Sequence, residues 1–186
     1  MKNLIVLIIC ICSLSVAAQE TQSNIERKGF VIGLSLGGSA ISISESISDA
    51  NFDDAQGGLS LPNLKFGWML NERLALMATF PGMIYEYEGT DRSFDAFVPS
   101  LQYWMGNRWW INGGVGLAMD FPALYEVDNV RDEEWNFGCA VAISTGYELV
   151  QRGKFALDLQ TKLYLGRVSL GDKQYRDAAI FSVGVG

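Results

Sequence analysis

The chain contains 186 residues, with 20 glycines, four prolines, 12% aromatic residues and no histidine. Without histidine it cannot form a Ser-His-Asp triad, a histidine general base or a histidine metal ligand, which excludes much ordinary hydrolase and metalloenzyme chemistry. The formal net charge of −7 argues against a nucleic-acid partner. Many glycines and aromatic residues with few prolines favour β structure over helix.

The N-terminus has the pattern of an export signal. Lys2 supplies a positive start, residues 4–16 form an apolar run, and small residues precede Gln19 as at a cleavage site. A run of about 13 apolar residues is shorter than the roughly 20 that a membrane-spanning helix needs. We therefore predict a cleaved signal peptide at 1–18 and one domain at 19–186.

Beyond the signal, apolar residues alternate with small or polar residues, which is the period of a β-strand. In the clearest segment, Leu157 and Leu159 lie on one face and Asp158 on the other. Pro81 and Gly82 predict a bulge or bend inside another segment. The pattern predicts strands within residues 30–37, 62–70, 74–85, 97–105, 109–118, 136–147, 155–165 and 178–186.

The lengths of the connections alternate as well. Short turns are expected near 71–73, 106–108 and 150–154, and longer connections near 39–57, 86–95, 120–134 and 167–177. Outer-membrane barrels have short periplasmic turns and long extracellular loops. An even number of strands places both termini on the periplasmic side.

The two faces of the strands differ in a way that distinguishes a membrane barrel from a soluble one. A soluble lipocalin-like barrel has its bulky apolar face inside and its charged face outside. Here the bulky face carries almost no charge, and the other face holds small and polar residues. The sequence therefore predicts an all-β fold, an eight-stranded antiparallel up-and-down transmembrane β-barrel with its apolar face toward lipid.

Aromatic residues close to the strand ends could form the two interfacial girdles of such a barrel, although strand propensity alone would also enrich them. The candidates are Trp68, Tyr85, Tyr87, Tyr103, Trp109, Trp110, Trp135, Phe137 and Tyr147.

On this pattern, nearly all of residues 19–186 resembles the small outer-membrane barrels of Gram-negative bacteria, the OmpA/OmpX-like eight-stranded group. The resemblance implies the barrel fold, an outer-membrane location and outer-membrane lipids as neighbours. Such barrels usually finish with an aromatic residue that the assembly machinery reads, whereas this sequence finishes at Gly186.

Four charged residues are expected to face the barrel interior, namely Lys65, Glu148, Asp158 and Lys162. Interior charges need partners. Asp158 and Lys162 are four residues apart on one strand, or roughly 13 Å, so they cannot pair directly. Lys65 is the expected cross-strand partner. A structural ion network that fills the lumen is favoured over a gated narrow pore or acid/base catalysis.

Most acidic residues fall in the longer connections, and the densest group is Asp128, Asp132, Glu133 and Glu134. These carboxylates could form a surface for a divalent cation or a cationic extracellular partner. The alternative is a set of solvated loops that resists aggregation. The spacing lacks the regular acids and glycine of a calcium loop.

The sequence thus favours a non-enzymatic outer-membrane barrel with an envelope role or a surface-interaction role through acidic extracellular loops. No catalytic residue, cofactor or metal site is predicted. The alternatives are a narrow porin-like channel, an outer-membrane lipid-modifying enzyme and a soluble lipocalin-like ligand-binding barrel.

Overall fold

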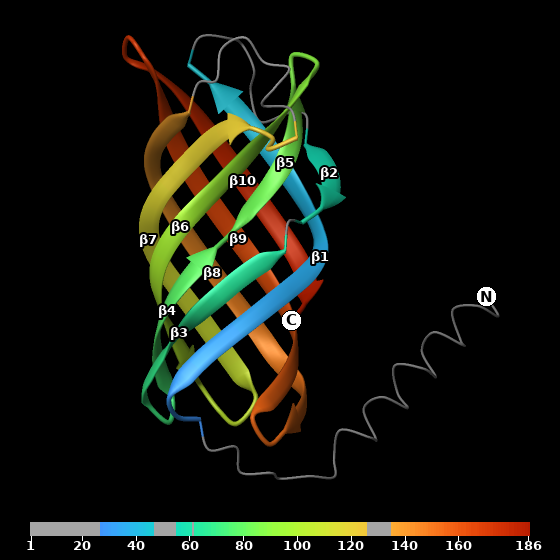
Figure 1. The fold of residues 1–186 in the computed structure, drawn as a ribbon, viewed down its shortest axis with the longest axis vertical. Coiled ribbons are helices and arrows are strands. Elements are labelled where there is room, and N and C mark those ends of the chain that lie inside the picture. The colour runs from blue at the N-terminus through green and yellow to red at the C-terminus, as the bar shows by residue number, and fades with distance from the viewer. Residues whose placement is uncertain (1–26, 47–54, 61, 126–134) are drawn as a thin grey trace, which may run out of the picture.

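A computed structural model of the protein describes residues 27–46, 55–60, 62–125 and 135–186 (Figure 1). The predicted signal peptide and the predicted acidic group at 128–134 lie outside these ranges. No helix in the described part of the chain is long and apolar enough to cross a membrane.

The described residues form one antiparallel sheet. Its strands are β1 (Phe30–Glu45), β2 (Gln56–Leu59), β3 (Asn63–Asn71), β4 (Leu74–Phe80), β5 (Gly82–Tyr87), β6 (Thr90–Trp104), β7 (Trp109–Pro122), β8 (Asn136–Arg152), β9 (Phe155–Gly171) and β10 (Gln174–Val185).

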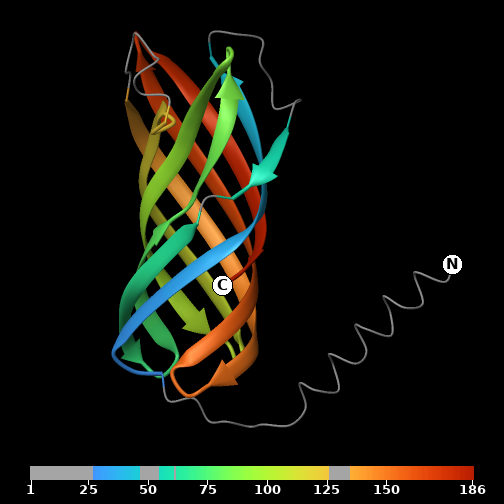
Figure 2. The same ribbon diagram turned by 45° about the vertical axis from the view of Figure 1, so that its right-hand side comes forward.

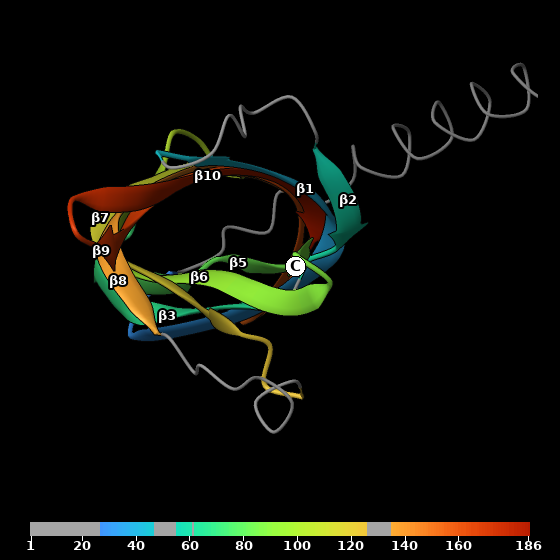
Figure 3. The same cartoon turned by 90° about the horizontal axis from the view of Figure 1, so that it is seen from above.

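The sheet closes because β10 pairs with β1. This pairing runs from Leu36 opposite Val185 to Glu45 opposite Arg176. Around the ring the order is β10, β9, β8, β7, β6, β4, β3 and β1. Figure 3 shows the barrel from above, along its axis, and Figure 2 shows the tilt of its strands. The predicted fold class, an eight-stranded antiparallel barrel, is confirmed.

Two further strands arise from interruptions in this wall. β5 continues the path of β4 beyond Pro81, and both strands pair with β6. This break lies at the predicted bend. β2 runs beside β1 beyond the end of β3. Between β2 and β5, the side-chain amide of Gln56 donates to the carbonyl of Glu86 and accepts from its N–H, each at 2.8 Å. A side chain therefore bridges the wall where the backbones of β2 and β5 do not pair.

Two of the expected long connections are tight hairpins instead. β5 and β6 join through Glu88 and Gly89, and β9 and β10 join through Asp172 and Lys173. All four residues have positive φ, between 43° and 80°. Two residues of positive φ form the turn that matches the right-handed twist of paired strands. The strands therefore extend through 86–95 and 167–177, beyond the apolar alternation that revealed them in the sequence.

The outer surface carries a belt of large apolar side chains. Ile32 and Val115, for example, are each 69% exposed. A continuous apolar surface of this kind is unusual for a protein in water and is the surface that a membrane barrel presents to lipid.

The interior is less uniformly small and polar than the sequence suggested. In the half of the barrel that contains β5, a buried apolar cluster includes Ile41, Met83, Phe94, Tyr164 and Ile180. Eight strands enclose a space that side chains can fill. The bulky inward residues therefore act as a core.

Aromatic residues border the outer belt at both ends. Near the short turns the exposed ones are Trp68, Tyr103, Trp109 and Tyr147, and near the opposite end they are Trp135 and Phe137. Trp110, Tyr85 and Tyr87 were wrong girdle candidates because their side chains point inward. Trp110 is only 1% exposed, although its neighbour Trp109 is 53% exposed. Adjacent residues of a strand face opposite sides, so nearness to a turn does not decide the face.

Cys139, the only cysteine outside the predicted signal peptide, tests which face of the wall meets lipid. It is exposed on the outer side of β8. We expect a nitroxide attached there, in protein reconstituted into bilayers, to collide more with oxygen than with a water-soluble nickel chelate. A nitroxide on Cys139→Ser/Lys173→Cys, at a hairpin tip, should show the opposite preference. Equal access of the nickel chelate to both sites would contradict the transmembrane assignment.

Candidate functional site

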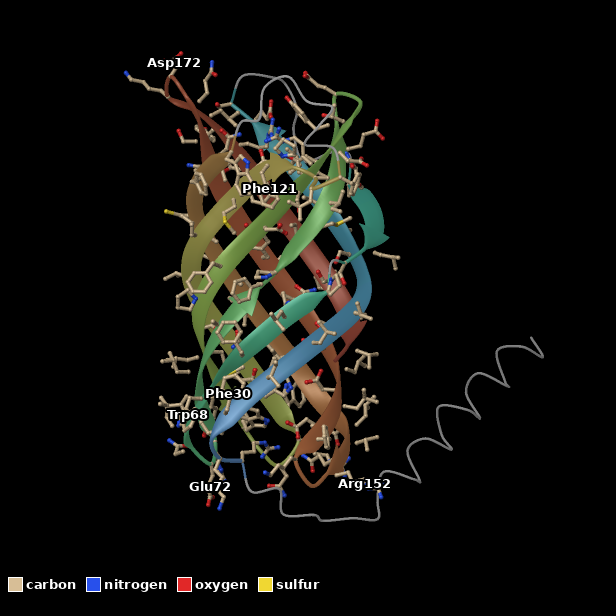
Figure 4. The ribbon with its side chains drawn as sticks, viewed as in Figure 1. Phe30, Trp68, Glu72, Phe121, Arg152 and Asp172 are labelled. Atoms are coloured by element: carbon tan, nitrogen blue, oxygen red, sulfur yellow. The ribbon has the colours of Figure 1, made fainter. Side chains whose placement is uncertain are left out.

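The charged side chains of the interior gather in two groups at different heights. We call the end of the barrel with the short turns the turn end, and the opposite end the loop end. In Figure 4, Glu72 and Arg152 mark the turn end and Asp172 marks the loop end. The turn-end cluster consists of Arg27, Lys65, Trp104, Trp110, Glu148 and Asp158. The loop-end cluster consists of Glu45, Tyr85, Tyr87, Arg92, Asp120 and Arg176.

The two acids of the turn-end cluster lie side by side, because Glu148 of β8 is opposite Asp158 of β9. Glu148 accepts hydrogen bonds from Arg27 at 2.8 Å and from the indole of Trp104 at 2.7 Å. The Arg27 guanidinium also lies over the Trp104 ring, 4.9 Å from its centre. Glu148 therefore joins the segment before β1 to β6 and β8.

Asp158 has an equivalent set of partners. Lys65 of β3 forms a 3.5 Å ion pair with it, and the indole of Trp110 donates at 3.1 Å. The Lys65 ammonium lies 4.4 Å from the centre of the Trp110 ring. The structure thus brings Lys65 and Asp158 together across the lumen. Trp104 and Trp110, neither of which was predicted to face the interior, complete the cluster.

Lys162 lies on β9 between the two clusters, and its ammonium donates to the side-chain oxygen of Asn63 at 2.8 Å. Ser35, Asn63, Gln160, Lys162 and Ser182 line a cavity of about 10 Å³ at this level. Roughly 10 to 15 Å³ is needed for one water molecule. The space beside Lys162 is therefore small.

The loop-end cluster centres on Asp120, whose side chain is fully buried. Arg92 donates to both of its carboxylate oxygens, each at 3.1 Å, and the Tyr85 hydroxyl donates at 2.9 Å. Arg176 pairs with both Asp120 and Glu45. Because Glu45 and Arg176 lie on β1 and β10 and Asp120 on β7, the cluster crosses the lumen.

Tyr87 completes this group by donating to Glu45 at 2.8 Å, and the centre of its ring lies 4.1 Å from the Arg176 guanidinium carbon. Arg176 is 5% exposed and Glu45 is 8% exposed. Two arginines therefore balance two buried carboxylates. Buried charges are tolerated when they are paired in this way.

The loop-end cluster was not predicted from the sequence, because Glu45, Arg92 and Asp120 fall in segments that were expected to be connections. They lie in strands, but beyond the stretch where the outer face is apolar. The one signal in the sequence that could have revealed it is the alternation of inward and outward residues, continued past the apolar stretch. The side chain of Ile41 in β1 points inward, and so does every second residue after it, which includes Glu45.

The predicted acidic loop residues Asp128, Asp132, Glu133 and Glu134 lie outside the described residues. Among the described residues, the exposed surface of the loop end presents Glu86, Glu88 and Asp172, with Lys173 beside them. The turn end carries several arginines and lysines. The two ends therefore differ in charge.

Comparison with protein-family models and with curated proteins finds no match. Solved structures do match in shape. Neisserial surface protein A superposes with a TM-score of 0.57 at 15% identity, covering 85% of this chain and 97% of that chain. Ail, the attachment invasion locus protein of Yersinia pestis, gives 0.54 at 10% identity, covering 86% and 99%. At these identities the likeness shows the fold, which is that of small outer-membrane barrels.

Arg176→Met tests the loop-end cluster. Removing this guanidinium leaves Glu45 and Asp120 buried with only Arg92 as a cation, so we expect a loss of about 3 kcal/mol or more in the free energy of unfolding. Equilibrium urea unfolding in lipid vesicles, followed by tryptophan fluorescence, measures it.

Arg167→Met is the matched control, because Arg167 pairs with Asp177 on the outer surface with its side chain 61% exposed. Exposed ion pairs contribute little to stability. Equal destabilisation by the two variants would refute a special role for the interior cluster.

Proposed function

We propose that this protein is a non-enzymatic barrel of the outer membrane that acts through its exposed loop end, as an envelope or surface-interaction protein. The observation that carries the proposal is the filled lumen. Two hydrogen-bonded ionic clusters cross it, and bulky side chains such as Phe94, Tyr164 and Trp110 lie buried within it. An interior occupied in this way favours a role at the surface over passage of solute.

We also propose that the protein is located in the outer membrane. The exposed apolar belt with aromatic borders supports insertion in a bilayer. Residues 1–18 would direct export and be removed, leaving 19–186 as the barrel domain. Outer-membrane lipids then surround the belt.

The interior charges favour stability over catalysis. Asp120, Glu148 and Asp158 are each engaged by arginine, lysine or indole donors within the barrel. A general acid or base needs an open side on which substrate can bind. Groups held by several partners in a filled interior are better suited to fixing the barrel wall.

The charge of the loop end favours a cationic partner. Ail has been solved in complex with sucrose octasulfate, an analogue of heparin and therefore a polyanion. In this chain, Glu86, Glu88 and Asp172 would repel such a ligand. A basic extracellular protein segment or a divalent cation fits this surface better.

Electrical recording separates the surface role from the channel alternative. Protein reconstituted in a planar bilayer is expected to give no stable conductance steps, because both clusters obstruct the lumen. An open porin in the same bilayer serves as the positive control. Reproducible steps from the folded protein, absent after it is denatured, would replace our proposal with the narrow channel.

Binding measurements test the acidic surface. In nanodiscs, the protein should bind a lysine-rich peptide with salt-dependent affinity and should not bind sucrose octasulfate. Glu86→Gln/Glu88→Gln/Asp172→Asn should weaken peptide binding by about tenfold, since each exposed pair contributes up to roughly 1 kcal/mol.

A second variant neutralises Asp128, Asp132, Glu133 and Glu134 together and should weaken binding similarly. Glu72→Gln, at the turn end, is the control and should change nothing. Tighter binding of the sulfated sugar than of the peptide would reverse the proposed partner class.

A further inference from the structure

The turn end carries a set of cations that the proposed surface role does not use. We call them the basic ring, and they are Lys28, Arg73, Arg108, Arg152 and Lys154. In the described part of the turn end, the exposed acid is Glu72. Glu148 lies at the same end but is buried inside the barrel.

The cations are distributed around the rim. Arg73 lies in the turn between β3 and β4, Arg108 between β6 and β7, and Lys154 between β8 and β9, while Lys28 precedes β1. The strand order places these turns at successive positions around the barrel. A partner that contacts all of them must therefore extend over the whole circumference of the turn end.

Four of the five cations in the basic ring have no acidic partner among the described residues. Among the described residues, no carboxylate lies within ion-pair distance of Arg73, Arg108, Arg152 or Lys154. Arg108 donates to the backbone carbonyls of Glu148 and Leu149, at 3.4 and 3.1 Å, which fixes its position and retains its charge.

Exposed aromatic residues lie immediately above the ring. Trp68, Tyr103, Trp109 and Tyr147 project from the same ends of the strands, and Figure 4 shows Trp68 and Phe30 just above the level of Glu72 and Arg152. Aromatic side chains of this kind settle at the headgroup level of a bilayer. The cations therefore stand at the depth of lipid phosphates.

We propose that the basic ring binds the headgroups of anionic phospholipids in the leaflet at the turn end. Charge complementarity requires an anionic ligand, and the position of the ring at headgroup level points to the phosphate diester of a phospholipid with net negative charge. The circular distribution favours a surrounding lipid surface over a single protein partner. A cation near an anionic surface gains enough attraction to enrich such lipids on the order of fivefold.

Quenching by brominated lipids tests this directly. Trp109→Phe/Trp135→Phe keeps Trp68 as the exposed tryptophan at the turn end, while the indoles of Trp104 and Trp110 stay inside the barrel. In phosphatidylcholine vesicles containing a minor fraction of brominated phosphatidylglycerol, we expect about fivefold more quenching of Trp68 than with the same fraction of brominated phosphatidylcholine. The excess should disappear at high salt.

Two matched variants complete the test. Adding Arg73→Gln, Arg152→Gln and Lys154→Gln should abolish the excess, with folding verified by the gel shift between boiled and unboiled protein. Trp68→Phe/Trp109→Phe reports instead from Trp135 at the loop end, where no excess is expected. Equal quenching by the two lipids at Trp68, or the same excess at Trp135, would overturn the proposal. If the triple variant fails to fold, the salt dependence and the Trp135 comparison decide it.

Discussion

A wall that faces hydrocarbon must satisfy its own backbone hydrogen bonds, since lipid offers no donors or acceptors. In this protein the pairing of β10 with β1 meets that constraint by closing the sheet. Between β2 and β5, which do not pair with each other, the Gln56 amide bonds both backbone groups of Glu86. Closure also gives the barrel two different surfaces. The side chains of the outer surface must be apolar, and those of the inner surface must fill a narrow space.

The filled interior follows from the width of an eight-position ring. Large inward side chains fit because small residues face them. A Cβ atom on Gly146 would lie 2.4 Å from the Trp110 ring, and one on Gly166 would lie 2.5 Å from Phe94. Inward glycines therefore make room for rings from other strands. Carboxylates and cations complete the packing, and their mutual hydrogen bonds offset the cost of removing them from water.

The same barrel separates charge along its axis. Acids are exposed at the loop end and cations at the turn end, while the carboxylates of the two interior clusters are paired with cations inside. A molecule with opposite charges at its two ends has a preferred orientation in a membrane whose surfaces carry charge. The proposed surface role and the proposed lipid contacts therefore use opposite ends and need not compete.

The sequence by itself determined the number of wall strands, the position of the short turns and the face that meets lipid. Each of these depends on local alternation, which a transmembrane strand must keep. It also placed Lys65, Glu148, Asp158 and Lys162 on the inner face. Only the tertiary structure decided which charges meet, because Glu45 and Arg176 are 131 residues apart and are neighbours only after closure. It likewise decided how far the strands extend, since beyond the lipid belt the outer face is no longer held to apolar residues and the alternation fades.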